Sequence, residues 1–131
     1  MYRNVLIVLA VVNILTGLQI FFMPQFFYDN VPGVSMMGPF NLHFIRDAGL
    51  SFLAAGLMQG FGVRKSNYLV CVVATTWPVF HALFHIQMWM ARGFSLDLIA
   101  FVNLIGIQLP AWAALYAAMA LYNSHKGTAH D

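Results

Sequence analysis

The sequence has few charged side chains: only 8% of its 131 residues are charged, and it contains no glutamate. Ordinary soluble domains have about 25% charged and about 45–50% apolar residues. Here 61% of the residues are apolar and the mean hydropathy is +0.76. A small soluble domain buries too little surface to hide so many apolar side chains from water. The composition therefore excludes a soluble enzyme and a disordered chain, and it predicts an integral membrane protein.

Other features are scarce or missing. The single cysteine, Cys71, cannot form an internal disulfide, and its place in an apolar run predicts a small core side chain. The net charge of +2 rests on too few basic residues for a nucleic-acid surface. The sequence has no phosphate-binding loop, nucleophile elbow, Cys-x-x-Cys pair or dinucleotide fingerprint. No motif therefore predicts a reaction.

Four apolar segments dominate the sequence, each long enough to cross a bilayer as one helix. We expect spans at residues 4–23, 41–62, 68–91 and 98–122. The first is too long for a signal peptide and is expected to be retained. Pro78 and Pro110 predict kinks in the third and fourth spans. The sequence thus predicts an all-α fold with one integral membrane domain over residues 1–131, a four-helix antiparallel transmembrane bundle.

Basic residues outside the spans predict the orientation, because they concentrate in the cytoplasm. One side of the four-span arrangement holds Arg3, Arg64, Lys65 and Lys126. Outside the spans, the other side holds only Arg92. Both termini are therefore expected in the cytoplasm. The connection over residues 25–40 is rich in aromatic and methionine side chains, so we expect it to lie on the outer membrane surface or over the bundle mouth.

Polar side chains inside the spans are informative, because burying them in lipid is costly. With a rise of about 1.5 Å per residue, His43 and Asp47 lie roughly 3 and 9 Å from the outer end, and His85 and His81 roughly 9 and 15 Å. Each pair is spaced i, i+4 and shares one helical face. Arg46 lies at the same level. We therefore expect His43, Arg46, Asp47, His81 and His85 to form an outward-facing ligand-binding or relay site.

Three interpretations of these histidines stay open, and one of them is a site for an organic ligand. His81 and His85 have the spacing of transition-metal ligands, Asp47 would add a carboxylate and His43 a fourth ligand, with copper, iron or haem as the cofactor. Alternatively, the imidazoles hydrogen-bond across helices and specify packing. Asp47 is expected to accept a hydrogen bond from His43 or His81. Arg46 needs an anionic, carbonyl or headgroup partner, or must extend outward to the interface.

Small and aromatic residues are expected to serve packing. Gly56 and Gly60 form a Gly-x-x-x-Gly pair that allows close helix approach, within one bundle rather than between copies. The last span has a stripe of small residues, namely Ala113, Ala114, Ala117 and Ala118. The tryptophans are expected in the interfacial belt or the core.

Residues 31–49 carry a distinctive pattern: Val-Pro-Gly-Val at 31–34, then Gly-Pro-Phe-Asn-x-His-Phe-x-Arg-Asp-x-Gly at 38–49. This pattern resembles a group of small bacterial four-span membrane proteins of unknown function. The whole chain resembles, more loosely, DoxX-like four-helix membrane proteins, some of which are linked to quinone or sulfur redox systems. The resemblance implies a multi-pass protein of the bacterial inner membrane and does not imply a particular reaction.

Three functions fit these observations. The first is a small inner-membrane protein whose outward-facing site serves ligand binding or redox support, since four short spans leave little room for alternating access. The second is a membrane metal- or haem-binding redox protein. The third is a structural or accessory subunit of a larger complex. The expected partners are the lipid bilayer and a homo-oligomer or larger membrane complex, with no nucleic acid.

Overall fold

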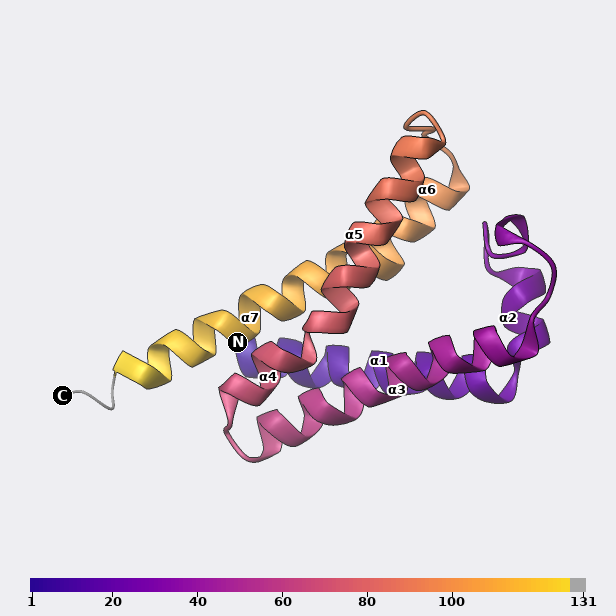
Figure 1. Cartoon of the computed structure of the whole chain (residues 1–131). Helices are drawn as coiled ribbons and strands as arrows, with labels where there is room; N and C mark the ends of the chain where they lie inside the picture. Colours follow the sequence, from indigo (N-terminus) through magenta and orange to yellow (C-terminus); the bar gives the residue numbers. More distant parts are fainter. Residues whose placement is uncertain (128–131) are drawn as a thin grey trace.

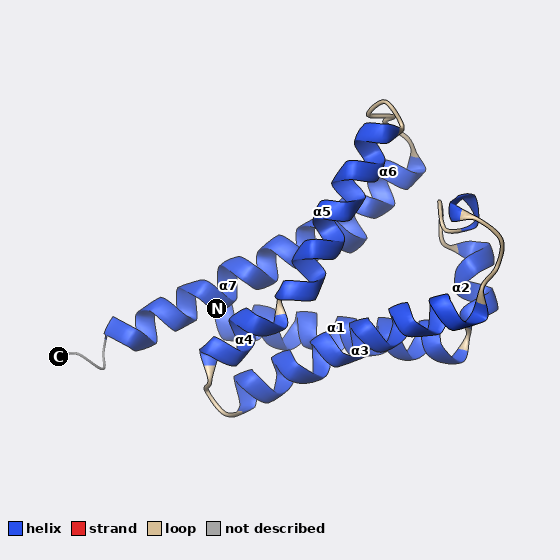
Figure 2. Ribbon diagram, viewed as in Figure 1, coloured by secondary structure: helices blue, strands red, loops and turns tan. Residues whose placement is uncertain are grey.

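The computed structural model describes residues 1–127, which contain helices and connecting turns and no β-strand (Figures 1 and 2). In chain order the elements are α1 (Tyr2–Phe22), α2 (Pro24–Asn30), the 3-10 turn η1 (Ser35–Met37), α3 (Leu42–Arg64), α4 (Tyr68–Ala74), α5 (Thr76–Ala91), α6 (Leu98–Asn103), the π-helical segment η2 (Leu104–Gln108) and α7 (Leu109–Gly127). The all-α prediction is confirmed. Each expected span coincides with one helix or with consecutive helical segments.

Three helical stretches within residues 1–127 are long and apolar enough to cross a membrane: Tyr2–Phe22, Tyr68–Ala91 and Leu98–Lys126. The chain is therefore a membrane protein by length and composition. The α3 helix, with 23 residues, is long enough to cross a membrane but is not one of these three stretches. Its hydropathy is lower because Arg46, Asp47 and Gln59 lie within it.

Both expected proline interruptions are present, a few residues before each proline. Pro78 has no N–H for the Ala74 carbonyl, and the helix is interrupted there between α4 and α5. The hydroxyl of Thr75 donates to the Val72 carbonyl at 2.7 Å. Ahead of Pro110, the helix widens into the π-helical turn of η2. This wider turn gives the proline ring room where an α-helical carbonyl would collide with it.

The α1 and α3 helices pack closely along a seam of glycines. A Cβ on Gly17 would lie 2.6 Å from the Leu53 nitrogen, and one on Gly56 would lie 2.8 Å from the Ala10 carbonyl oxygen. A Cβ on Gly60 would meet its nearest neighbour at an ordinary 3.9 Å. The expected close approach of two helices within the chain is confirmed at Gly56. The other close contact between α1 and α3 is at Gly17, and Gly60 does not make one.

At one end of the molecule, α1, α3, α4 and α7 pack around small side chains. We call this region the converged end; its buried cluster consists of Leu6, Val63, Cys71, Ala114, Ala117 and Ala118. The alanine stripe of the last span supplies three of these positions, and Cys71 is a core side chain as expected. Small residues let the four helices approach one another closely here.

At the opposite end, the molecule divides into two arms that diverge (Figure 1). The first arm contains α1 and α3 and continues into α2, and the second contains α5, α6 and η2. The 31–41 connection reaches from the first arm to the second, because a Cβ on Gly33 would lie 3.0 Å from Cγ2 of Ile99 in α6. The connection therefore extends toward the mouth between the arms.

A short turn joins α5 to α6 at the tip of the second arm. The Asp97 carboxylate accepts a hydrogen bond from the Ala100 N–H, which caps α6, and another from the Arg92 guanidinium. These contacts hold the pKa of Asp97 below its ordinary value. The indole N–H of Trp89 donates to the Ser95 carbonyl at 2.9 Å and closes the same turn.

Candidate functional site

The centre of the second arm is a pair of imidazoles on α5. His81 and His85 lie one helical turn apart, with ring centroids 4.6 Å apart and planes at 67°. Both residues are half-buried. The expectation that these two side chains share one face is confirmed.

Aromatic rings surround this imidazole pair. The Trp77 ring is stacked on His81 at 4.8 Å, with an angle of 11° between the planes. Phe52, from the first arm, meets both rings edge-on, at 4.6 Å from Trp77 and 5.6 Å from His81. Phe84 lies edge-on to His85 at 6.1 Å. Trp77 therefore belongs to a stacked aromatic site, a position beyond the belt-or-core role expected from the sequence.

Amide side chains join α5 to the segment that follows it. The Gln108 amide donates to the Ala82 carbonyl at 2.9 Å and to the Asn103 side-chain oxygen at 3.2 Å. Asn103 in turn donates to the His85 carbonyl at 3.5 Å, and the Trp112 indole N–H donates to the Gln108 oxygen at 3.1 Å. This amide ladder holds the backbone that carries the imidazoles.

The sequence analysis missed Gln108 and Trp112 for a geometrical reason. Asn103 and Gln108 are five residues apart, and a regular α-helix would turn two such side chains about 140° away from each other. The η2 segment is π-helical, which brings positions i and i+5 onto one side. The available signal was Pro110, because a π turn is one way for a helix to accommodate a proline.

The imidazole ring nitrogens are available to a ligand. No hydrogen bond formed within residues 1–127 uses a ring nitrogen of His81 or His85. A cavity of about 20 Å³ beside His81, lined also by Asn13 and Phe52, is large enough for one water molecule. An ionisable group inside an apolar span without a protein partner is a candidate functional residue, because its burial in lipid is costly.

His43 and Asp47 form a separate pair on the first arm. The His43 ring nitrogen lies 3.5 Å from an Asp47 carboxylate oxygen. Their side chains are 89% and 57% exposed, at the start of α3. Asp47 therefore has His43 as its partner, one of the two partners expected for it.

Arg46 contacts the end of α1. Its Nε donates to the Phe21 carbonyl at 3.3 Å, and its guanidinium carbon lies 5.4 Å from the Phe21 ring centroid. A cation beside the last carbonyls of a helix is stabilised by the helix dipole. The partner of Arg46 is thus a backbone carbonyl, and this residue anchors the first arm.

The structure does not bring the predicted site residues together. His43 and Asp47 lie on the first arm and His81 and His85 on the second, and the arms diverge away from the converged end. Within residues 1–127, no three His, Cys or Asp side chains are placed to hold a metal ion. The four-ligand metal site is therefore wrong for this arrangement. Two imidazoles on one face of one helix also cannot occupy the opposite axial positions of a haem iron.

Comparisons with known proteins yield no match among protein families, curated proteins or solved structures.

Proposed function

We propose that this chain is a four-span protein of the bacterial inner membrane, with both ends of the chain in the cytoplasm. The support for α3 as the fourth span is its pairing with α1. Its 23 residues extend about 35 Å, enough for the hydrocarbon core of about 30 Å. Its Gln59 and Arg46 donate to carbonyls of α1 rather than facing lipid without partners.

The distribution of basic residues supports this orientation. The N-terminus, the turn between α3 and α4 and the end of α7 lie at one end of the molecule (Figure 1). That end holds Arg3, Arg64, Lys65 and Lys126. Cytoplasmic ends of membrane proteins carry such an excess of Lys and Arg. The two arms and the long connection then face outward.

We further propose that the second arm binds a lipid-soluble ligand with a planar ring and hydrogen-bonding oxygens, a compound of the quinone class. The observation that carries this proposal is the stacked Trp77–His81 pair beside His85. Imidazole N–H groups suit ring carbonyl or hydroxyl oxygens, and the aromatic faces suit a planar ring.

Each residue has a role in this proposal. His81 and His85 donate hydrogen bonds to the ring oxygens, and Trp77 stacks on the ligand or on the imidazole beneath it. Asn103 and Gln108 hold the two parts of the second arm together and so position the imidazoles. By binding such a redox-active molecule, the chain would support a redox system of the membrane.

Tryptophan fluorescence tests this function. The protein in mild detergent is titrated with decylubiquinone, and saturable quenching is expected. Substitution of His81 by leucine should weaken the apparent affinity about tenfold, since a lost hydrogen-bond donor costs about 1 kcal/mol or more. Trp77→Phe should remove most of the saturable signal. His43→Leu, on the exposed pair of the first arm, is the matched control. It should leave the apparent affinity and the saturable quenching unchanged.

Two results would contradict the proposal. One is a wild-type protein whose quenching does not saturate. The other is a His81→Leu variant that binds decylubiquinone as the wild type does. Stoichiometric copper or iron that is lost with both His81→Leu and His85→Leu would support the metal-binding alternative instead.

A further inference from the structure

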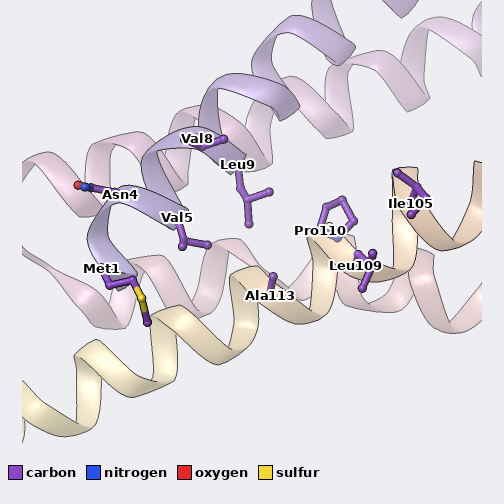
Figure 3. Close-up of a pocket in the computed structure, with 9 residues that line it drawn as sticks. All are labelled: Met1, Asn4, Val5, Val8, Leu9, Ile105, Leu109, Pro110 and Ala113. Atoms are coloured by element: carbon purple, nitrogen blue, oxygen red, sulfur yellow. The ribbon is translucent and has the colours of Figure 1, made fainter.

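A groove of about 500 Å³ lies between α1 and the start of α7, and neither His81 nor His85 lines it (Figure 3). Val5 and Leu9 of α1 face Pro110 and Ala113 of α7 across it. The remaining lining is also apolar except for Asn4, which lies at the end of the groove nearest the N-terminus. An elongated apolar groove with one polar end matches the shape and polarity of an amphiphile.

Among residues 1–127, the charged side chains at this end of the molecule are all basic. The converged end carries four basic residues, namely Arg3, Arg64, Lys65 and Lys126. No acidic residue within residues 1–127 lies there. Each one that these residues contain is at the other end and has a local partner: Asp29 with Gln25, Asp47 with His43, and Asp97 with Arg92. Arg3 is the residue before Asn4 in the first turn of α1, so a basic residue lies within the same helical turn as the polar end of the groove.

Tyrosines place the membrane interface at the same level. Tyr2 and Tyr116 lie edge to face at 5.7 Å, and Tyr68 and Tyr122 also belong to the converged end. Tyrosine rings collect where the hydrocarbon core meets the headgroups. The polar end of the groove is therefore at headgroup level, and its apolar length runs into the hydrocarbon core.

We infer that the groove binds one anionic phospholipid, with an acyl chain between α1 and α7 and the phosphate beside Arg3 and Asn4. A helix of a second copy does not fit, because a helix with its side chains is about 10–12 Å across. A volume of 500 Å³ would hold about one turn of such a helix. The chain of a lipid is thin enough to lie along the whole groove.

Native mass spectrometry of the full chain in mild detergent tests this site. Phosphatidylglycerol and phosphatidylcholine with the same acyl chains are titrated in parallel. One phosphatidylglycerol should be retained about fivefold more tightly than phosphatidylcholine, since one basic contact contributes about 1 kcal/mol. Arg3→Gln should remove this preference. Arg64→Gln, at the same end but on α3, is the matched control and should keep it.

A second pair of variants tests the groove itself. Ala113→Phe fills the groove and should abolish retention of both lipids. Ala54→Phe, at an exposed alanine of α3, is the control and should retain them. Melting curves recorded without added lipid show whether both variants are folded. Equal retention of the two lipids by the wild type, or unchanged retention by Ala113→Phe, would overturn the inference. A dimer that disappears only in Ala113→Phe would identify a second copy as the occupant.

Discussion

The converged end and the second arm solve the packing of membrane helices in different ways. At the converged end, glycine and alanine bring four helices together around Leu6 and Cys71, with few polar groups. In the second arm, amide and indole side chains join α5 to η2 and α7, and two imidazoles keep free ring nitrogens. The difference indicates that close packing of small residues holds the converged end, whereas polar side-chain contacts hold the second arm.

The largest expected effect comes from breaking the glycine seam between α1 and α3. Gly17→Ala would place a Cβ 2.6 Å from the Leu53 nitrogen, where backbone rather than a flexible side chain must move. We expect a loss of about 3 kcal/mol or more, at the upper end of overpacking costs. Gly60→Ala, with its nearest atom at 3.9 Å, should be neutral or stabilising by about 0.5–1 kcal/mol. Unfolding in mixed detergent measures the stability of both variants. Equal losses of stability would show that Gly17 is no more tightly packed than Gly60.

The second-largest effect is expected from truncating a buried leucine of the converged end, compared with an exposed leucine of the second arm. Leu6 has no exposed surface, and Leu6→Ala should cost about 2–5 kcal/mol because it leaves a cavity in the converged end. Leu83 on the second arm is 45% exposed, so Leu83→Ala should cost much less. The same unfolding assay applies to both. A Leu83→Ala loss as large as that of Leu6→Ala would show that the second arm also contributes a stabilising core.

Leucine substitutions at two glutamines should change the free energy of unfolding by different amounts. Gln108→Leu removes the centre of the amide ladder and leaves the Trp112 N–H without its acceptor, so we expect a loss of about 1 kcal/mol. Gln59 is fully buried at the converged end, and its Oε1 has no hydrogen-bond partner within residues 1–127. Gln59→Leu removes this unsatisfied atom together with the hydrogen bond from Gln59 to the Leu6 carbonyl, so the loss should be smaller than that of Gln108→Leu. Melting temperatures in one detergent compare the two variants.

The smallest expected effect concerns the turn at the tip of the second arm. Asp97→Asn keeps an N-cap for α6 but removes the ion pair with Arg92. Because the folded-state pKa of Asp97 is lowered, the carboxylate stabilises the fold above its unfolded pKa, and this contribution is lost as the pH falls through the folded pKa. A slightly lower melting temperature at pH 7, which converges with the wild type at acidic pH, is the expected result. A difference that persists at low pH would assign the effect to capping.

Hydropathy predicted where the helices lie, because a membrane helix must be long and apolar whatever its neighbours are. The i, i+4 spacing likewise predicted the His81–His85 and His43–Asp47 pairs, since each lies within one helix. Depth alone could not predict whether the pairs meet. Two residues at the same level of different helices are neighbours only if the helices stay parallel, and here they diverge.

The glycine seam and the amide ladder escaped prediction for a related reason. Gly56 and Gly60 matched a familiar spacing, but the close approach depends on which helix crosses which, and Gly17 is the residue that faces α3. Asn103 and Gln108 become neighbours only in a π-helical turn. Both features depend on the relative rotation of helices, which a hydrophobic pattern does not contain.

The π turn sets the rotation of α6 relative to α7. An α-helix turns about 100° per residue, and a π turn accommodates one extra residue in the same rise. If the same residues between Asn103 and Leu109 formed a regular α-helix, α6 would be rotated by about 100° relative to α7. Asn103 would then face away from α5 although every side chain of the site is present. Substitutions that return residues 104–108 to a regular α-helix should therefore disturb the site even when they replace none of its side chains.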